Sequence, residues 1–596
     1  DALTDLSITA NYGDLTVGNI GASGSAENLA SVTVSADNGA TATLSGTITA
    51  DTTDSASDLA MTVTSTAETS STVDLGTVTN TFGAITGTFG GAGTTDSTAL
   101  TADDVTLTIN SGGGTHAAIT ATDDVVMTVA NTAATAVTSL DFGATTAGSA
   151  DITLTGSSTF GLATIVASAG TLTVDGSGAS GAITVGNTNN NMTGASTLTG
   201  GSGDDNLTGG AGDDTITGGA GDDTITIANG DDTVYGGAGD DGITLSGTGT
   251  DAMYGQAGDD TFTVGTATQL TSADTVDGGD GDDTLAITLA GATIAPTTTS
   301  VETVTATYGA TTGGAINLGN ASGATKLNLV SSANATTATA INLADGITVD
   351  VTDANTDTIV LDMAAGGSMN LTYDAASGTS TTISDAVGVT IASGAAAGDA
   401  TAMAFDDTDT LSLAVNATTF TIDTGNVTAT SAMTSLSAST TTAGATVVVG
   451  TVAEVEALTS LTLTASNGDV TMGALGGTGV ADELATLTIS SSGGDATVGA
   501  INADTTSNDA TDLAMTITAS ASAGDTSTVG AVDNEFGTVT INASGSGTVT
   551  MGALTAADAT IDASDVTGAF TVSSASVAAA VDATFGIGSN TYTVGL

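Results

Sequence analysis

The sequence predicts an elongated all-β protein in which a parallel β-roll is flanked by arms of the β-solenoid or β-helix type. Three observations lead to this prediction. Residues between Gly200 and Ala286 repeat a nine-residue unit, the remainder alternates apolar and polar residues with a period of two, and no segment carries an amphipathic helical stripe. β-Sandwich arms are the alternative, and the short turns and the low content of large apolar residues favour the solenoid.

The nine-residue unit is clearest in three copies that follow one another without a gap. They read Gly-Gly-Ser-Gly-Asp-Asp-Asn-Leu-Thr over residues 200–208, Gly-Gly-Ala-Gly-Asp-Asp-Thr-Ile-Thr over residues 209–217, and the latter nine residues again over 218–226. The glycines permit a tight turn that directs backbone carbonyls inward, and the last three residues form a short strand with one apolar side chain facing the core. Two units, about 18 residues, therefore close one turn of a parallel β-roll.

The sixth position of the unit is an aspartate that stays in phase through the whole block. Its members are Asp205, Asp214, Asp223, Asp232, Asp241, Asp251, Asp260, Asp274 and Asp283. One extra residue precedes Asp251 and a longer insertion precedes Asp274, and both insertions are expected in turns, where they leave the strands intact. Carboxylates and backbone carbonyls are the hard oxygen ligands that Ca²⁺ accepts, so these aspartates are the predicted metal ligands and Ca²⁺ is the predicted cofactor. A flexible Gly/Asp-rich linker is the alternative, but a linker does not keep an apolar residue in phase with its acids.

The arms read as successive short strands punctuated by Gly, Ser, Asn and Asp. Residues 101–109 match residues 121–129 in sequence. Their offset equals the length expected for one turn of a right-handed parallel β-solenoid, which is about 20 residues. A larger repeat joins the two ends of the chain. Residues 13–18 recur as residues 468–473, and residues 26–34 recur as residues 481–489.

These repeats predict four parts. They are an N-terminal solenoid-like arm over residues 1–190, a calcium-binding β-roll over 191–290, a middle β-rich domain over 291–448, and a C-terminal β-rich module over 449–596 that duplicates residues 13–107. Similar ends favour head-to-tail contacts between copies, which generate filaments or lattices. A duplication without present use is the alternative.

Composition limits the expected partners. The chain has 65 acidic residues against one lysine and no arginine, for a formal net charge of −64, and it has no cysteine and no tryptophan. Nucleic acid and anionic membranes need Lys and Arg to displace their counterions, so neither is an expected partner, whereas divalent cations are. No stretch of 18 uninterrupted apolar residues occurs, so no membrane span is predicted.

The sequence also predicts that the protein is not an enzyme. Its single histidine, His116, excludes the two-histidine H-E-x-x-H zinc motif and is expected in a surface loop, because a glycine-rich, turn-like stretch precedes it. The acid pairs Asp103/Asp104 and Asp123/Asp124 are expected to be solvated turn residues or additional Ca²⁺ ligands. Carboxylate pairs that cleave sugars normally work beside aromatic platforms, which a chain without tryptophan hardly offers.

The nonapeptide block resembles the calcium-binding repeats of RTX proteins, which Gram-negative bacteria secrete. A Val-Glu-Thr-Val-Thr strand at residues 301–305 and Ala/Thr-rich β repeats follow the block directly, and this order resembles the S-layer proteins of RTX type. The resemblance implies type I secretion, folding in extracellular Ca²⁺ and self-assembly into a lattice on the cell surface. The implied partners are further copies of the chain and, through another segment, cell-surface polysaccharide. A calcium-dependent extracellular filament and an RTX adhesin are the alternatives.

Overall fold

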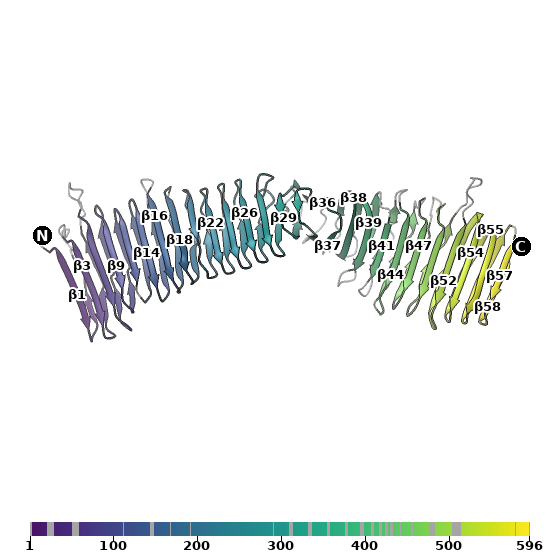
Figure 1. The fold of residues 1–596 in the computed structure, drawn as a ribbon, viewed down its shortest axis with the longest axis horizontal. Coiled ribbons are helices and arrows are strands. Elements are labelled where there is room, and N and C mark those ends of the chain that lie inside the picture. The colour runs from purple at the N-terminus through teal and green to yellow at the C-terminus, as the bar shows by residue number, and fades with distance from the viewer. Residues whose placement is uncertain are drawn as a thin grey trace. The chain divides into compact units, whose positions relative to one another are not determined.

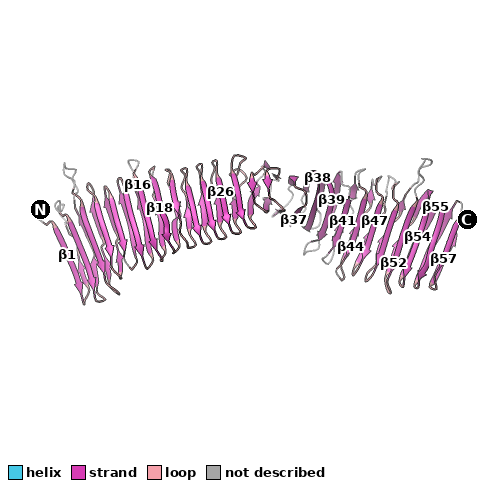
Figure 2. Cartoon of the chain, in the orientation of Figure 1, coloured by secondary structure: helices cyan, strands magenta, loops and turns pink. Residues whose placement is uncertain are grey.

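Parallel strands stacked turn upon turn make up this chain, and no helix occurs among the residues that the structure describes (Figure 1, Figure 2). This is the all-β solenoid architecture that the alternating sequence pattern predicts. The computed structural model describes residues 3–20, 29–50, 59–110, 112–142, 148–166, 169–190, 192–289, 291, 293–308, 314–331, 337–353, 358–375, 379–393, 398–406, 410–415, 420–422, 427–429, 433–441, 443–453, 457–475, 483–503, 514–578 and 580–594.

The chain divides into two compact units. The first comprises Asp1–Ala286 and Pro296–Val301, and the second comprises Ile287–Ala295 and Glu302–Leu596. The four-part division expected from the repeats stays a prediction. In the described part of the chain, no helix has the length and hydropathy needed to cross a bilayer.

The first unit has a long first face, a second face and a short third face. The first face runs through β1 (Asp5–Asn11), β3 (Ser31–Asp37), β6 (Met61–Ala67), β9 (Ile85–Gly90), β12 (Val105–Asn110), β14 (Val125–Asn131), β16 (Ser149–Gly156), β18 (Thr171–Ala179), β20 (Ser196–Thr199), β22 (Thr215–Ala220), β24 (Thr233–Ala238), β26 (Ala252–Ala257), β28 (Thr275–Asp280) and β31 (Thr298–Thr299). The second face runs through β5 (Thr47–Thr49), β8 (Thr77–Asn80), β11 (Ala99–Ala102), β13 (Gly114–Ala121), β15 (Thr135–Asp141), β17 (Phe160–Ile165), β19 (Ile183–Asn190), β21 (Asn206–Thr208), β23 (Thr224–Ile227), β25 (Gly242–Leu245) and β27 (Thr261–Val264). The third face consists of β2 (Leu15–Val17), β4 (Thr41–Leu44), β7 (Thr72–Asp74) and β10 (Thr94–Asp96).

Alternation along each strand places one row of side chains in a narrow core. In β12, Val105, Leu107 and Ile109 are buried, while the residues between them face outward. Val105 pairs with Val125 of β14, its counterpart in the matching stretch of sequence, so each turn covers the apolar edge of the turn before it. The turn length predicted from residues 101–129 is confirmed.

Turns are shortest in the nonapeptide block, and the insertions lie outside the strands. Thr215 of β22 pairs with Thr233 of β24, which is 18 residues later. Thr233 pairs with Ala252 of β26 after 19 residues, and Ala252 pairs with Thr275 of β28 after 23 residues. The strands keep their register because the loops absorb the added residues, as the sequence predicts.

The second unit uses the same construction, again with turns of different lengths. β29 (Thr284–Leu289) begins in the first unit and ends in the second. The other strands of the second unit are β30 (Thr293–Ile294), β32 (Thr303–Tyr308), β33 (Gly314–Asn317), β34 (Ala321–Ser322), β35 (Lys326–Ser331), β36 (Thr337–Leu343), β37 (Ile347–Asp353), β38 (Thr358–Ala375), β39 (Thr379–Ser393), β40 (Gly398–Asp406), β41 (Thr410–Val415), β42 (Phe420–Ile422), β43 (Val427–Ala429), β44 (Ser435–Thr440), β45 (Thr446–Val449), β46 (Val452–Ala453), β47 (Ser460–Ala465), β48 (Asp469–Met472), β49 (Thr486–Ser491), β50 (Ala496–Val498), β51 (Ile501–Asn502), β52 (Met515–Ala521), β53 (Thr526–Val529), β54 (Val532–Gly545), β55 (Thr548–Val566), β56 (Ala569–Val577), β57 (Val581–Phe585) and β58 (Ser589–Val594). Ala569 pairs with Ser589 across a short turn, whereas Thr486 pairs with Thr516 across a longer one.

Parallel pairing decides between the two architectures that the sequence leaves open for the arms. A β-sandwich is made of antiparallel sheets. Here β3 pairs in parallel with β6 in the first unit, and β44 pairs in parallel with β47 in the second unit. The arms are therefore solenoids and not sandwiches.

The sequence repeat at the two ends corresponds to the same order of strands within each unit. Residues 13–18 contain β2, and residues 468–473 contain β48. Residues 26–34 contain the beginning of β3, and the matching residues 481–489 contain the beginning of β49. Residues 26–28 and 481–482 of that match lie outside the described residues.

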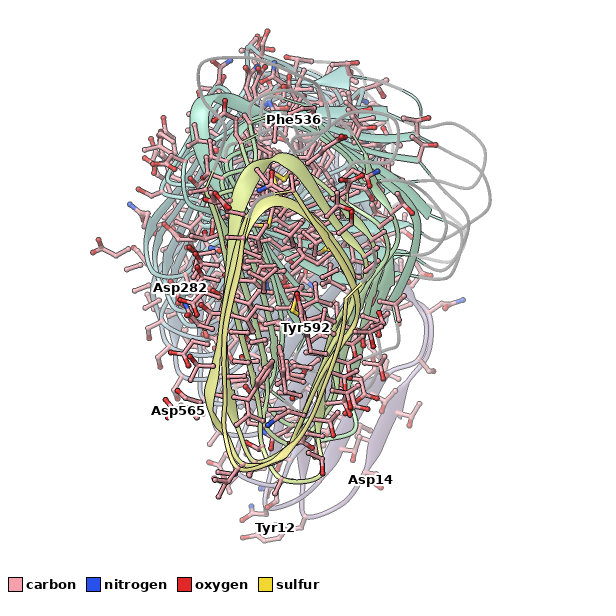
Figure 3. The ribbon with its side chains drawn as sticks, turned by 90° about the vertical axis from the view of Figure 1, so that its right-hand side faces the viewer. Tyr12, Asp14, Asp282, Phe536, Asp565 and Tyr592 are labelled. Carbon is pink, nitrogen blue, oxygen red and sulfur yellow. The ribbon has the colours of Figure 1, made fainter. Side chains whose placement is uncertain are left out.

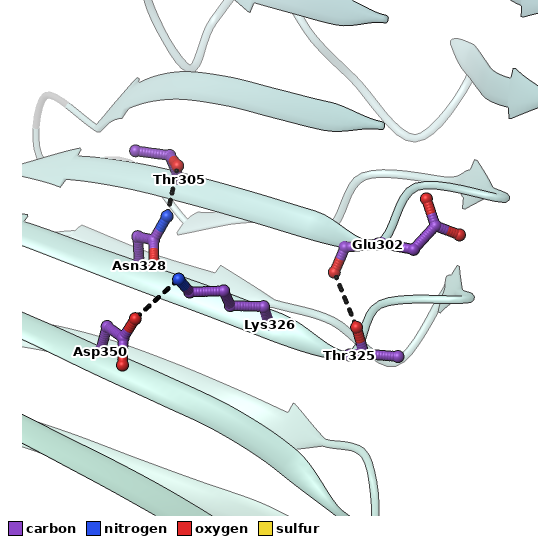
Figure 4. Close-up of polar contacts among 6 residues, drawn as sticks. All are labelled: Glu302, Thr305, Thr325, Lys326, Asn328 and Asp350. Carbon is purple, nitrogen blue, oxygen red and sulfur yellow. Dashed lines mark hydrogen bonds and ion pairs between the residues drawn. The ribbon is translucent and has the colours of Figure 1, made fainter. Parts of the chain in front are cut away.

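Polar side chains on the outside of the second unit link successive turns (Figure 4). The amide of Asn328 donates to the hydroxyl of Thr305 over 3.1 Å, and Lys326 Nζ lies 2.8 Å from Oδ2 of Asp350. Lys326 is the only lysine in the sequence, which has no arginine. Because the ion pair is partly exposed to solvent, it contributes at most about 1 kcal/mol to stability.

His116 is buried, so the expectation of a surface-loop histidine is wrong. It lies in β13 with none of its surface exposed, its ring edge-on to Phe89 with 4.8 Å between ring centroids. Its Nδ1 lies 2.9 Å from the hydroxyl oxygen of Ser97. β13 begins at Gly114, so strand alternation and not the glycine-rich turn decides the direction of the imidazole. Burial lowers the pKa of His116 to about 4, which leaves the ring neutral at neutral pH.

A methyl group at Gly93 is expected to destabilise the first unit. A Cβ there would lie closer than 3.0 Å to the carbonyl oxygens of Glu68 and Ser71 in the previous turn, whereas a Cβ at Gly90 would meet no atom within 4 Å. Gly93→Ala should lower the free energy of unfolding by about 1–3 kcal/mol, while Gly90→Ala should change it by less than about 0.5 kcal/mol. Urea titration followed by circular dichroism measures both, and equal effects would contradict the close stacking of turns.

Candidate metal centre

Each sixth-position aspartate of the nonapeptide block ends a turn and lies directly before a strand. Asp205 precedes β21, Asp214 precedes β22, and the arrangement continues to Asp283 before β29. All of these side chains are buried, with at most 2% of the residue surface exposed: Asp205, Asp214, Asp223, Asp232, Asp241, Asp251, Asp260, Asp274 and Asp283. The apolar residue two positions later, such as Leu207 after Asp205, faces the core and anchors the end of the turn.

The structure divides these aspartates between two edges of the roll. Turns that lead from the first face to the second face form the first edge and end in Asp205, Asp223, Asp241, Asp260 and Asp283. Turns that lead back to the first face form the second edge and end in Asp214, Asp232, Asp251 and Asp274. Aspartates of consecutive units therefore lie on different edges, whereas aspartates two units apart stack on one another.

A hydrogen-bond ladder connects the aspartates along each edge. The backbone N–H of one aspartate donates to Oδ1 of the aspartate one turn later. On the first edge the donors are Asp205, Asp223, Asp241 and Asp260, over 2.7–2.8 Å. On the second edge they are Asp214, Asp232 and Asp251, over 2.7–3.0 Å. The ladder fixes one oxygen of each carboxyl group and stacks like charges at the strand spacing of about 4.8 Å.

The second carboxyl oxygen is buried without a hydrogen-bond partner in much of the ladder. This holds for Oδ2 of Asp223, Asp232, Asp241, Asp251 and Asp260. At one end of each ladder the backbone supplies a partner, because Asp205 Oδ2 accepts from Gly201 N–H over 2.6 Å and Asp274 Oδ2 accepts from Thr271 N–H over 2.5 Å. A buried, unpaired carboxylate is costly, so the interior of the ladder needs either protons or a cation.

Burial raises the pKa of these carboxyl groups above the ordinary value of 3.8. The pKa reaches about 7 for Asp223, Asp232 and Asp260, and about 6 for Asp241 and Asp251. Loss of solvation is the main cause, the N–H bond to Oδ1 opposes it, and neighbouring carboxylates add to it. The pKa values of Asp205 and Asp214 are also raised by burial. A cation would therefore compete with protons for these oxygens.

On the first edge, a carbonyl oxygen of the next turn faces each carboxyl group across a glycine. A Cβ placed on Gly218 would lie closer than 3.0 Å to both Oδ2 of Asp223 and the carbonyl oxygen of Gly236. A carboxyl oxygen and a next-turn carbonyl oxygen converge in the same way at Gly200, Gly236, Gly255 and Gly278. This space has no room for a side chain, but its charged and neutral oxygens suit a hard cation such as Ca²⁺.

The second edge is built differently. Its turns begin with Gly209 and then with Ile227, Leu245 and Val264 at the equivalent position. These three aliphatic side chains are buried, and their strands pair so that Ile227 lies beside Leu245 and Leu245 beside Val264. A Cβ on Gly209 would have its three nearest contacts with atoms of Asp214 and Ile216, not with a carbonyl oxygen. The first edge therefore has next-turn carbonyl oxygens beside its carboxyl groups, whereas the second edge has aliphatic side chains in most of the equivalent places.

A second row of carboxylates, at the fifth position of the unit, was not predicted as functional. Asp222 N–H donates to Oδ1 of Asp204 over 3.1 Å, and Asp240 N–H donates to Oδ1 of Asp222 over 3.0 Å. This outer row bonds toward the previous turn, opposite to the buried row. Its side chains are exposed, and Asp282 points away from the ribbon (Figure 3). The Asp-Asp pair, which seven of the nine units contain, is the sequence signal for the outer row.

A separate acidic group lies in the N-terminal part of the first unit. Carboxyl oxygens of Asp104, Asp123 and Asp124 lie within 4.8 Å of one another, and all three side chains are exposed. Oδ1 of Asp124 also accepts from the N–H and the hydroxyl of Ser149, over 2.7 Å and 3.1 Å. Stacking of adjacent turns explains the proximity, and the role of these acids as Ca²⁺ ligands stays a prediction.

Without metal, the stability of the roll is expected to fall as the pH rises. The folded roll keeps these carboxyl groups protonated up to pH values of about 6 to about 7, whereas unfolded groups ionise near 3.8. Between these values the folded state binds more protons, so its free energy of unfolding decreases with rising pH. Bound Ca²⁺ should reverse the trend, because it requires the ionised groups. Urea unfolding at several pH values, after metal removal and in excess Ca²⁺, measures both; a metal-free midpoint that rises from acid to neutral pH would contradict the assignment.

Asparagine on the first edge should separate fold stability from metal binding. Asp223→Asn with Asp241→Asn keeps both Oδ1 acceptors and removes two buried charges. At neutral pH the metal-free variant should gain about 1–3 kcal/mol in free energy of unfolding. Its Ca²⁺ affinity, measured by calorimetry, should fall at least about tenfold. Asp222→Asn with Asp240→Asn in the exposed row is the matched control, with smaller effects expected on both quantities.

The profile of the RTX calcium-binding nonapeptide repeat matches the chain in four copies, at residues 192–225, 228–247, 245–266 and 270–286. These residues contain all of the predicted aspartate ligands. No curated protein and no solved structure matches the chain. Repeats of this kind bind calcium, and proteins that carry them are typically secreted. The roll is therefore a block of RTX calcium-binding nonapeptide repeats, and Ca²⁺ is its cofactor.

Proposed function

We propose that this protein is a structural protein of the outer cell surface, which folds on binding Ca²⁺ and self-assembles into an extracellular lattice of the S-layer kind. The observation that carries the proposal is the pair of buried carboxylate ladders, because they make a folded chain depend on a cation. Its partners in this proposal are further copies of the chain and, through another segment, cell-surface polysaccharide.

Calcium acts in this proposal as the signal to fold. At neutral pH and without a cation, stacked carboxylates such as Asp223, Asp241 and Asp260 repel one another and lose solvation in the folded roll. The chain then remains unfolded where calcium is scarce, as in the cytosol. Binding after export supplies free energy directly to folding.

Charge also links calcium to assembly. At a formal net charge of −64, copies of the chain repel one another unless cations screen them. The exposed carboxylates of the outer row, among them Asp222, Asp240 and Asp259, form a regular line that divalent cations would neutralise. The sequence likeness of residues 13–107 to the C-terminal module favours head-to-tail contacts between copies.

A non-enzymatic role is part of the proposal. The chain has one histidine, and His116 is buried against Phe89 and Ser97. It therefore has no solvent-facing imidazole to act as a general base at neutral pH. The aspartates with the most strongly raised pKa values lie in the calcium-binding roll.

An RTX adhesin is the second candidate, and a groove in the first unit favours it. The groove has a volume of about 680 Å³, and Asp96, Thr115 and Phe160 are among the residues that line it. Asp96 Oδ1 accepts from Thr115 N–H over 2.7 Å, which fixes the carboxyl group at the groove wall. This volume is typical of small-ligand sites. Glycan binding by the dispersed protein that is lost in Asp96→Ala would favour the adhesin.

Negative-stain electron microscopy in Ca²⁺, in Mg²⁺ and in chelator tests the proposed assembly. Ordered sheets are expected in Ca²⁺ and should dissolve in chelator. No sheets are expected in Mg²⁺, because Mg²⁺ retains its waters and fits flexible protein cages poorly. The variant Asp223→Asn with Asp241→Asn should require more Ca²⁺ to assemble than the parent chain. Fibres would favour the filament, and dispersed particles in excess Ca²⁺ would refute assembly.

A further inference from the structure

The last turn of the first edge holds an arrangement of oxygens that the nonapeptide pattern does not supply. In the preceding turn the carboxyl group of Asp260 faces the carbonyl oxygen of Gly278, the first glycine of the next unit on that edge. The unit that begins at Gly278 is the last one, and the match to the RTX repeat ends at residue 286. The carbonyl oxygen at the equivalent place belongs to Ser300.

Strand register brings Ser300 to this position. Asp277 of β28 pairs in parallel with Thr299 of β31, so Gly278 and Ser300 follow at the same level of the stack. A Cβ on Gly278 would lie closer than 3.0 Å to both the carbonyl oxygen of Ser300 and Oδ2 of Asp283. These residues all belong to the first unit. Ser300 thus takes the role that glycines play in the other turns of this edge.

Ser300 also has a strained backbone. Its φ angle is 50°, in the left-handed region that residues with a side chain rarely adopt. Such a conformation is unfavourable and persists only where the surroundings impose it, often at ligand clamps. The next residue, Val301, is fully buried and anchors the turn. A bound cation would offset the strain.

We propose that the carboxyl group of Asp283 and the carbonyl group of Ser300 hold a divalent cation of the Ca²⁺ class, between the last nonapeptide unit and the turn that follows it. Asp283 is fully buried, and its Oδ1 accepts the N–H of Asp260 over 2.7 Å, which orients the carboxyl group. Both donors are hard oxygens, as Ca²⁺ prefers. The ion ties residues 296–301 to the nonapeptide roll of the first unit. This site rests on the calcium binding of the block and is independent of the proposed lattice.

Two substitutions at Ser300 test the site. Ser300→Gly keeps the carbonyl and permits the left-handed backbone, so it should bind as many Ca²⁺ ions as the parent chain. Ser300→Val disfavours that backbone, because β-branched residues rarely adopt positive φ, and should bind one ion fewer or bind it at least about tenfold more weakly. Calorimetry on the full chain gives the number of ions. Hydrogen exchange over residues 296–301 should show Ca²⁺-dependent protection in the parent and in Ser300→Gly only.

Two further variants separate a lost ligand from a disturbed fold. Asp283→Asn keeps the acceptor for Asp260 N–H and should lose the same ion as Ser300→Val. Asn342→Val places a β-branched residue at another left-handed position, with φ 57°, in the second unit and should leave calcium binding unchanged. The proposal is overturned if Ser300→Val binds the full number of ions at parental affinity, or if Ser300→Gly loses an ion as well. Assembly observed by microscopy reports on the lattice separately.

Discussion

The constraint on which this structure depends is that each turn lies directly on an equivalent turn. Each residue therefore lies beside the equivalent residue of the neighbouring turn. For apolar residues this is favourable, and Leu207, Ile225 and Ile243 form such a column. For turn residues it is a steric limit, since a Cβ at Gly93 would meet the carbonyl oxygens of the turn before it. For carboxylates the same stacking is repulsive, and protons or cations must resolve it. One geometric rule therefore explains the narrow core, the glycines and the metal dependence.

Much of the fold was predictable because stacking leaves a periodic trace in the sequence. The period of two identifies strands such as β12, and the matched residues 101–109 and 121–129 give the length of a turn. The aspartates of the roll were predictable for the same reason. The inward direction of His116 was not, because its position in β13 depends on a strand that begins within a glycine-rich stretch.

Two features of the metal site lie beyond a nine-residue pattern. The pattern treats all units alike, but the fold sends alternate units to different edges, and the difference between Gly218 and Ile227 acquires meaning only there. Ser300 lies outside every unit and reaches the first edge through the pairing of β31 with β28. Apolar burial, worth about 1.5–3 kcal/mol for each large aliphatic side chain, adds to the stability of the second edge. The first edge has carbonyl oxygens in that place, which adds possible ligands for a cation.

In the buried carboxylate row each N–H donates to the next turn, and in the outer row each N–H donates to the previous turn. Each turn offers the next one the same donors and acceptors that it receives from the one before, as the bonds from Asp205 to Asp223 and from Asp222 to Asp204 show. Removing or duplicating two consecutive units in the DNA would rejoin turns that make the same backbone and carboxylate bonds. We therefore expect the block to tolerate changes of length in steps of one full turn, because each step keeps these bonds.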